Sequence, residues 1–248
     1  MSKKISLKQF LMKSGKFDKV SDCISAIENG LITINGKAMT NPKYFSNPKE
    51  SLIKFFNQKL RKVSNLYFLM NKPAGYLPQK SNEEKTIYNM LKNLNLPQES
   101  IQSLHAVGRL DKDTEGLLIL TNDGKLSNMI MSPENGIIKK YYAVLEEPAD
   151  NDKIKILEKG SKIKINHKLH KTKPCKIKIT GEKEVYISLT EGKKKQIRKM
   201  FEAIGNKVIY LKRVSIGGLQ LGNLKVGEIK QITGEEIIDK LEFLKTNS

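Results

Sequence analysis

Residues 108–124 read GRLDKDTEGLLILTNDG and combine a polar loop with an apolar run. Asp111 follows Arg109 and precedes a tight polar turn, after which Leu117–Leu120 are continuously apolar. An apolar run of this length, bounded by glycines, indicates a buried strand. We therefore expect Asp111 in a loop that is anchored to the core at its end. The adjacent arginine favours the ionised carboxylate, which is the form that a nucleophile or a general base needs.

Strand and helix patterns on both sides of this loop are intermixed. They do not follow a regular alternation of strands and helices, which argues against a doubly wound parallel sheet. We expect an α+β fold with a mixed, mainly antiparallel sheet flanked by helices. The strands are expected near residues 66–72, 104–108, 117–121, 139–147, 175–180, 184–190 and 207–212, and the helices near 86–94, 124–131, 150–159 and 194–204.

The N-terminal segment has a different pattern. Apolar residues at helical spacing predict helices over residues 7–14 and 19–29, and an alternating strand follows at 31–34. Asn35-Gly36 is a strong signal for a two-residue hairpin turn. A further extended run covers residues 52–56, and a polar, basic linker follows it. We therefore expect a small domain over 1–62 and a larger one over 66–246.

The charge of the chain points to an acidic partner. The 248 residues carry a net charge of +19, which suits a polyanion such as RNA, although a generally basic proteome would also explain it. Residues 1–63 hold 13 basic and 4 acidic residues, a net of +9. We therefore expect an RNA-binding segment at the N-terminus.

The cysteines and histidines give no sign of a metal or disulfide framework. Cys23 and Cys175 are far apart and lack C-x-x-C spacing, so we expect two reduced thiols. His105, His167 and His170 form no ligand constellation, and the last two are expected in a lysine-rich loop. Without a signal peptide or a long apolar run, the sequence predicts a cytoplasmic protein that is not in a membrane.

The ordered motifs of the larger domain resemble pseudouridine synthases, above all those that modify ribosomal RNA and are typified by the bacterial small-subunit enzyme. The GRLD string resembles the family's signature motif, and residues 5–62 resemble the S4 RNA-binding domain. The other matching strings are NKPAG at 71–75, KKYYAVL at 139–145, EGKKKQIRKMF at 191–201 and LKRVSIGGL at 211–219.

The resemblance implies roles for particular residues. Asp111 occupies the position of the catalytic aspartate, whereas Asp113 is expected to be a turn residue. The motif K-x-Y-x-V selects Tyr142 as the platform for the base; on a strand it shares a face with Lys140, and Tyr141 points to the other side. Arg198 is the candidate partner of the Asp111 carboxylate. The expected RNA contacts are Lys19, Lys72, Arg109, Lys140, Lys195, Lys199 and Arg213.

Two positions depart from the family pattern. Lys195 stands where the family usually has histidine, which we do not take as loss of activity. The basic triplet that usually precedes the second S4 helix is Phe17-Asp18-Lys19, so that only Lys19 remains as a phosphate contact there.

The resemblance implies isomerisation of uridine to pseudouridine in ribosomal RNA, with the small-subunit RNA as the expected substrate. It implies no cofactor and no metal. The partner would be ribosomal RNA or a ribosomal-subunit assembly intermediate, and the protein would be a monomer. Two alternatives stay open: a synthase acting on large-subunit RNA, and a non-catalytic S4-type RNA-binding or ribosome-assembly factor.

Overall fold

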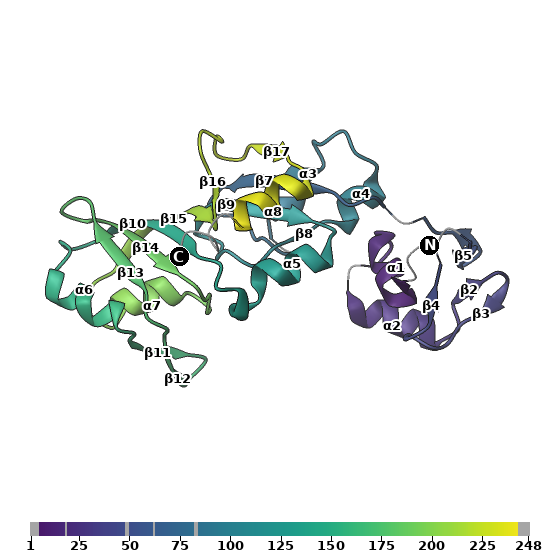
Figure 1. Cartoon of the computed structure of the whole chain (residues 1–248), viewed down its shortest axis with the longest axis horizontal. Helices are drawn as coiled ribbons and strands as arrows, with labels where there is room; N and C mark the ends of the chain where they lie inside the picture. The colour runs from purple at the N-terminus through teal and green to yellow at the C-terminus, as the bar shows by residue number, and fades with distance from the viewer. Residues whose placement is uncertain (1–4, 18, 48–49, 62, 82–83, 243–248) are drawn as a thin grey trace. The chain divides into compact units, whose positions relative to one another are not determined.

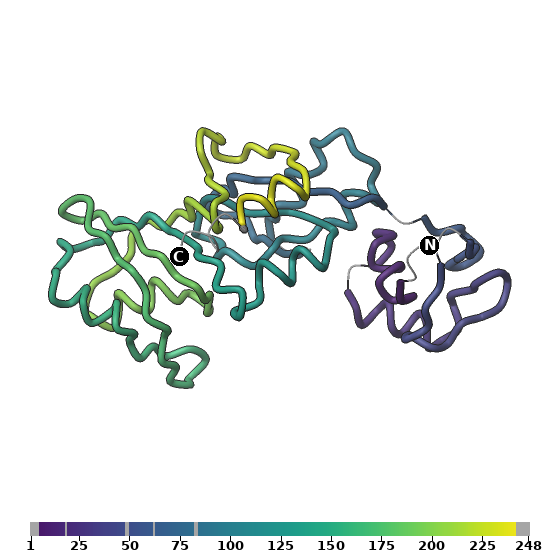
Figure 2. Tube along the Cα trace, viewed as in Figure 1, coloured from purple at the N-terminus to yellow at the C-terminus, as the bar shows by residue number. Residues whose placement is uncertain are grey.

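The chain forms two compact units in the computed structural model, drawn as a cartoon in Figure 1 and as a trace in Figure 2. The first unit contains the described residues of 1–66 together with 91–105, and the second contains those of 67–90 and 106–248. The structure describes residues 5–17, 19–47, 50–61, 63–81 and 84–242. The predicted domain limits at positions 1, 62 and 246 lie outside these residues, as does Asp18.

In the first unit, two short helices share a core with small strands. Helix α1 (Leu7–Lys13) begins at Ser6, whose hydroxyl accepts from the Gln9 amide while the Gln9 side chain accepts from the Ser6 amide. This reciprocal cap satisfies amides that have no partner within the helix. Helix α2 (Val20–Glu28) buries Ile27 toward the same cluster.

The strands of the first unit form two antiparallel groups. The four-stranded sheet has the order β3-β2-β5-β6, and β1 pairs with β4. Asn35 and Gly36 join β2 to β3 with φ angles of 51° and 85°, so the predicted hairpin is confirmed. The bounds are Ile5–Ser6 (β1), Ile32–Ile34 (β2), Lys37–Ala38 (β3), Phe45–Ser46 (β4), Ile53–Phe55 (β5) and Gln58–Lys59 (β6). Helix α4 (Gln98–Ser103) also belongs to this unit, whereas α3 (Ile87–Leu91) lies in the second unit except for its last residue.

A large sheet forms the second unit, with the strand order β13-β14-β10-β15-β9-β7-β17. Strands β15 and β9 run parallel, and the other neighbours on this path are antiparallel. The prediction of a mixed, mainly antiparallel sheet with helices is therefore confirmed. The bounds are Tyr67–Lys72 (β7), His105–Ala106 (β8), Glu115–Thr121 (β9), Lys139–Leu145 (β10), Lys176–Ile179 (β13), Glu184–Leu189 (β14), Val208–Ile216 (β15), Leu219–Gln220 (β16) and Ile229–Gln231 (β17).

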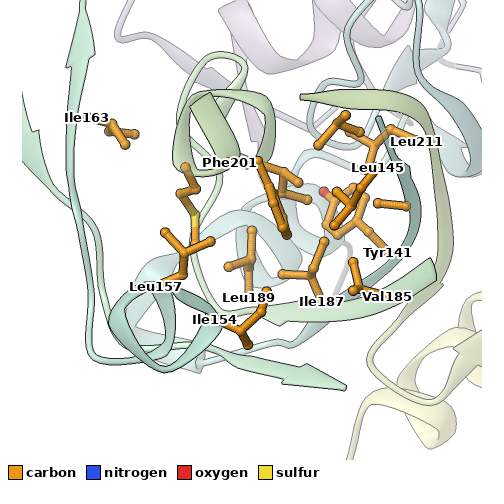
Figure 3. Close-up of a cluster of buried hydrophobic side chains, with 14 of the residues drawn as sticks. Tyr141, Leu145, Ile154, Leu157, Ile163, Val185, Ile187, Leu189, Phe201 and Leu211 are labelled. Atoms are coloured by element: carbon orange, nitrogen blue, oxygen red, sulfur yellow. The ribbon is translucent and has the colours of Figure 1, made fainter. Parts of the chain in front are cut away.

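Helices pack on this sheet in two hydrophobic clusters. Helices α6 (Asn151–Glu158) and α7 (Gln196–Glu202) bury Leu157 and Phe201 against β10, β14 and β15. Figure 3 shows Tyr141 among the side chains of this first cluster. Helices α5 (Gly124–Met131) and α8 (Gly234–Glu242) contribute to a second cluster beside β9, and a short 3-10 helix covers Pro133–Asn135.

The segment around His167 and His170 is a hairpin, not the lysine-rich loop expected from sequence. Strand β11 (Lys162–Ile165) pairs antiparallel with β12 (Lys168–Lys171). Asn166 and His167 form the turn with φ angles of 46° and 64°. The turn lacks glycine, so the usual sequence signal for such a hairpin is missing.

Candidate active site

Asp111 lies in the loop that enters strand β9, as the sequence predicted. The amide of Thr114 donates to the Asp111 carbonyl at 3.0 Å and closes a tight turn. The strand that follows is buried from Gly116 to Thr121. The loop is thus connected directly to the core, which limits the motion of the Asp111 backbone.

Lys72, at the end of β7, holds this loop from the inside. Its side chain is fully buried, and its ammonium donates to the carbonyls of Pro73, Lys112 and Thr114 at 2.8, 3.1 and 2.9 Å. Burial lowers the pKa of Lys72 to about 8, although the carboxylates of Asp113, Glu115 and Asp111 oppose this shift. The prediction that Lys72 contacts RNA needs correction, because all three ammonium protons are directed to main-chain oxygens.

A glycine brings β9 close to β15 beside this loop. Gly116 pairs with Arg213 in the parallel register and has a φ of 108°. A Cβ atom at this position would lie 2.2 Å from the Arg213 carbonyl oxygen. Only glycine therefore permits this strand spacing, which places Arg213 next to the start of β9.

A cavity of about 510 Å³ opens beside Asp111. This volume falls within the range of sites for small molecules or single nucleotides. Side chains from the Asp111 loop, β10, β15 and the loop before α7 contribute to its wall. Those that carry the argument are Arg109, Asp111, Lys139, Tyr141, Lys195 and Arg213.

Two of the cations in this wall are buried. Arg213 is only 3% exposed; its Nε donates to the Leu117 carbonyl at 2.7 Å, and its buried Nη2 has no hydrogen-bond partner among the described residues. An unsatisfied buried donor of this kind is costly. Lys139 is also buried, and its pKa is lowered by burial and then by the charge of Arg213. The cavity therefore offers positive charge to an anionic group.

The structure puts Tyr141, and not Tyr142, in the cavity wall. Tyr141 is 9% exposed and belongs to the core cluster on the α6 and α7 side of the sheet. Tyr142 projects from the opposite face of β10, where its ring contacts Tyr186 and Tyr210 at centroid distances of 5.4 and 6.1 Å. The predicted alternation of faces is correct, but the assignment of the cavity face to Tyr142 needs correction.

Arg198 also differs from its predicted role. Its Nη1 donates to the Val208 carbonyl at 2.6 Å, and its Nη2 to the Asp113 carbonyl at 3.4 Å. Both contacts are with main-chain oxygens, and Arg198 does not belong to the cavity wall. It connects α7 to β15 and to the turn that follows Asp111.

The loop before α7 is ordered around Glu191. Its carboxylate accepts from the Lys173 amide at 2.8 Å and from the Gln196 side chain at 2.7 Å, and it pairs with Lys193. Burial alone would raise the pKa of Glu191, but these hydrogen bonds outweigh it and leave the pKa below its ordinary value. Lys195 follows in a left-handed conformation, with a φ of 51°, and faces the cavity.

The remaining predicted RNA contacts are dispersed. Arg109 is exposed at the cavity. The Lys199 ammonium donates to the Lys164 carbonyl of the β11–β12 hairpin. Lys140 lies on the Tyr142 face of the sheet, with its ammonium 4.6 Å from the centre of the Tyr186 ring. Lys19 precedes α2 in the first unit.

Two further classes of site are absent from the described part of the chain. No group of three histidine, cysteine, aspartate or glutamate side chains there could hold a metal ion. No helix of that part has the length and apolar character needed to cross a membrane.

Comparison with known proteins gives consistent matches. The chain is 33% identical to the RNA pseudouridine synthase YtzG of Bacillus subtilis (strain 168) over 237 residues, covering 93% of this chain and 96% of the relative. It is 32% identical to the ribosomal small subunit pseudouridine synthase A of Escherichia coli (strain K12) over 212 residues, covering 85% and 89%.

A large-subunit enzyme and a solved structure match similarly. The ribosomal large subunit pseudouridine synthase B of Bacillus subtilis (strain 168) is 32% identical over 219 residues, covering 85% of each chain. A crystal structure of a pseudouridylate synthase superposes with a TM-score of 0.67 at 30% identity, covering 96% of this chain and 99% of the other. Residues 66–203, which carry Asp111, Tyr141 and the loop before α7, match the RNA pseudouridylate synthase family, and the chain belongs to this family.

Proposed function

We propose that this enzyme isomerises specific uridines in ribosomal RNA, with Asp111 as the catalytic carboxylate. One observation carries the proposal: Asp111, Tyr141 and Arg213 line the same nucleotide-sized cavity. Two of the relatives that match over most of the chain are named for ribosomal RNA, one for the small and one for the large subunit. The net charge of +19 suits such a polyanionic substrate.

The reaction redistributes bonds within one nucleotide. The bond between uracil N1 and ribose C1′ breaks, the base turns, and C5 bonds to C1′; N1 gains a proton and C5 loses one, so no redox equivalent is needed. The Asp111 carboxylate would act near C1′. The Tyr141 ring would stack on the extruded uracil, an interaction worth roughly 1–3 kcal/mol per base.

Arg213 replaces Arg198 as the proposed partner of the Asp111 carboxylate. Its Nη2 is buried without a partner among the described residues, and it lines the same cavity as Asp111. A charge-assisted hydrogen bond would satisfy this donor and fix the orientation of the carboxylate. Arg198 then acts as a positioning residue, because it contacts the Asp113 carbonyl.

We propose the small-subunit RNA as the substrate, either free or in an assembly intermediate. The support is the resemblance of the EGKKKQ loop to the small-subunit branch. The small-subunit and the large-subunit relative have the same sequence identity to this chain, 32%, so large-subunit RNA is the second candidate. Mapping pseudouridines in ribosomal RNA from cells with and without this protein decides between them, since the missing modification identifies the RNA.

We also propose an S4-like RNA-binding domain over residues 1–62 and a catalytic domain over 66–246, acting as a monomer in the cytoplasm. The two helices and the small antiparallel sheet of the first unit support the S4 assignment. Residues 91–105 cluster with this unit although they are distant in sequence. We therefore expect this segment to support the first unit physically.

The catalytic assignment predicts that Asp111→Asn abolishes isomerisation and leaves RNA affinity nearly intact. The amide keeps the size of the side chain but removes the anion that must act at C1′. Pseudouridine yield under single-turnover conditions, beside a binding titration, measures both effects.

Asp113→Asn is the matched control, because it makes the same chemical change at an exposed position of the same turn. It should retain the rate. Substantial turnover by Asp111→Asn would disprove the assignment. Wild-type protein that binds RNA without any turnover would instead favour the non-catalytic RNA-binding factor.

A further inference from the structure

The sheet of the second unit presents tyrosine and lysine side chains on the face opposite the cavity. Side chains of β13, β14, β10 and β15 alternate, and those paired with one another share a face. Tyr142 pairs with Tyr186 on one side and with Lys212 on the other, and Lys178 pairs with Tyr186. A single row across four strands therefore reads lysine, tyrosine, tyrosine, lysine.

The rings in this row are close to one another and to a cation. The centroids of Tyr142 and Tyr186 are 5.4 Å apart with an interplanar angle of 53°. The Lys140 ammonium lies 4.6 Å from the centre of the Tyr186 ring. Tyr210 adds a third ring at 6.1 Å from Tyr142. This set, consisting of Tyr142, Tyr186 and Tyr210, is called the tyrosine face below.

The tyrosine face lies away from the proposed catalytic site. Helices α6 and α7 pack on the other side of the sheet, against Tyr141 and Ile187. The three tyrosines keep part of their surface accessible, and Lys140, Lys176 and Lys178 are exposed around them. Tyr141 of the same strand belongs to the core cluster, whereas the three tyrosines of this face do not.

The net charge on this face is positive, and its two carboxylates are hydrogen-bonded to tyrosine hydroxyls. Lys140, Lys176, Lys178 and Lys212 share the face with Glu184 and Glu115. The Tyr210 hydroxyl donates to Glu115 at 2.7 Å. A hydrogen bond between Glu184 and the Tyr142 hydroxyl contributes, after burial, to raising the pKa of Tyr142. The carboxylates hold the phenols in place, and the lysines remain as the excess charge.

We propose that the tyrosine face binds a single-stranded segment of RNA outside the cavity. Bases would stack on Tyr186 and Tyr142, while phosphates would contact the surrounding lysines. Some RNA-binding modules use this chemistry: a four-stranded sheet presents aromatic side chains on which bases stack, and basic side chains contact the backbone. An acidic protein surface would complement the charge of the lysines, but it would not supply bases to stack on the tyrosine rings. The inference rests on the proposed function only in taking RNA as the polymer.

Photocrosslinking of the full-length protein tests the proposal without relying on turnover. The probe is a single-stranded uridine oligomer that carries 5-iodouridine, which crosslinks to stacked aromatic side chains. We expect mass spectrometry to find crosslinks on the peptides of Tyr186 and Tyr142, in wild-type protein and equally in Asp111→Asn. Crosslinks confined to residues of the cavity would overturn the proposal.

Matched variants add an affinity readout. Tyr186→Leu should weaken binding of the oligomer by roughly fivefold or more, the loss expected for one stacked base, whereas Tyr186→Phe should bind like wild type because the ring remains. Lys178→Gln should lower the slope of log affinity against log salt, by about 0.7 for a lost single-strand phosphate contact. Lys153→Gln on α6 is the control, because α6 packs on the opposite side of the sheet.

Crosslink mapping uses wild-type protein and Asp111→Asn, so this test does not depend on whether Tyr186→Leu folds. If Tyr186→Leu remains folded by thermal unfolding and binds as tightly as wild type, the tyrosine face is not an RNA site. Failure of the catalytic assignment would look different: Asp111→Asn would turn over while the crosslinks stayed in place.

Discussion

At the residue scale, two arginines of the site contact different parts of the structure. Arg213 lines the cavity, and its buried Nη2 has no partner among the described residues, whereas Arg198 donates to two main-chain carbonyls. We predict that Arg213→Lys lowers the single-turnover rate at saturating RNA on the order of 100-fold. A lysine cannot contact Leu117 and the cavity at once, and a lost charge-assisted hydrogen bond is worth about 2–3 kcal/mol.

Arg198→Lys is the comparison for this prediction. Arg198→Lys should lower the unfolding temperature clearly and change the single-turnover rate only slightly, because Arg198 connects α7 to β15 and lies outside the cavity wall. Single-turnover kinetics and thermal unfolding of both variants make the comparison. Equal losses of rate in the two variants would remove the reason for preferring Arg213.

The buried ammonium of Lys72 predicts a pH dependence. Its pKa of about 8 means that it loses a proton above that pH, and a neutral amine has only two N–H groups for three carbonyls. The Asp111 loop should then loosen, so the rate should fall as pH rises through about 8. Lys72→Met should be slow at every pH and lack this limb, whereas Lys112→Met, at an exposed position of the same loop, should keep it.

The same shift makes a statement about stability. The pKa of Lys72 lies below its unfolded value of 10.5, so folding disfavours the charged form. This destabilisation is fully present below pH 8 and is relieved as the pH rises toward 10.5. The free energy of unfolding of wild type, relative to Lys72→Met, should therefore increase over this range in denaturant titrations. A flat difference would contradict the assigned pKa.

Sequence analysis located Asp111, but it could not resolve the residues around it. The motif placed the carboxylate before a buried strand, and the structure agrees. The alternation of β10 separated Tyr141 from Tyr142, yet only the packing of α6 and α7 decides which face adjoins the cavity. The burial of Lys72 could likewise not be predicted, because a lysine at the end of a strand is typical of a surface position.

At the scale of elements, the parallel contact between β9 and β15 depends on Gly116. We predict that Gly116→Ala disrupts this contact. The φ of 108° is strained for alanine by about 1–3 kcal/mol, and the added Cβ would overlap the Arg213 carbonyl. Thermal unfolding and single-turnover rate should both fall.

Gly192→Ala serves as the control, because among the described residues no atom beyond its two chain neighbours lies within 4 Å of its added Cβ. It should unfold at nearly the wild-type temperature. A Gly116→Ala protein with wild-type stability and rate would contradict this prediction, because it would show that β9 and β15 can move apart without a loss of folding free energy.

The elements themselves were predicted where their apolar pattern is strong. Strands β7, β9 and β10 bury continuous or alternating apolar residues and were expected from sequence. The β11–β12 hairpin was missed because lysines alternate with few buried residues, of which Ile163 is one. Its turn of Asn166 and His167 also lacks the glycine that usually marks a hairpin.

At the scale of the whole molecule, charge in the first unit predicts a salt dependence. Replacing four exposed lysines of this unit by glutamine in the full chain should weaken RNA binding and flatten its dependence on salt. Each lost phosphate contact should lower the slope of log affinity against log salt by roughly 0.7–0.9. The four are Lys16, Lys19, Lys37 and Lys59.

A charge-matched control separates local contacts from net charge. Four exposed lysines of the second unit, changed in the same way, remove equal charge and should leave the slope nearly unchanged. They are Lys153, Lys159, Lys225 and Lys240. Equal slopes for the two variants would mean that the first unit does not touch the RNA backbone.

The fold class was predictable at this scale, because irregular intermixing of strands and helices excludes a doubly wound sheet. The membership of residues 91–105 in the first unit was not. A linker pattern in a sequence can only divide the chain into contiguous domains. Residues 91–105 are separated from the rest of the first unit in sequence, and only tertiary contacts group them with it.

Lys72 recognises the Asp111 loop through carbonyl oxygens, which every amino acid shares. The side chains at Lys112 and Asp113 are exposed and donate or accept none of these hydrogen bonds. Mutation can therefore exchange both of them while the carboxylate keeps its place. The position of the carboxylate therefore depends on the backbone of the loop and on Lys72, and not on the identity of its exposed side chains.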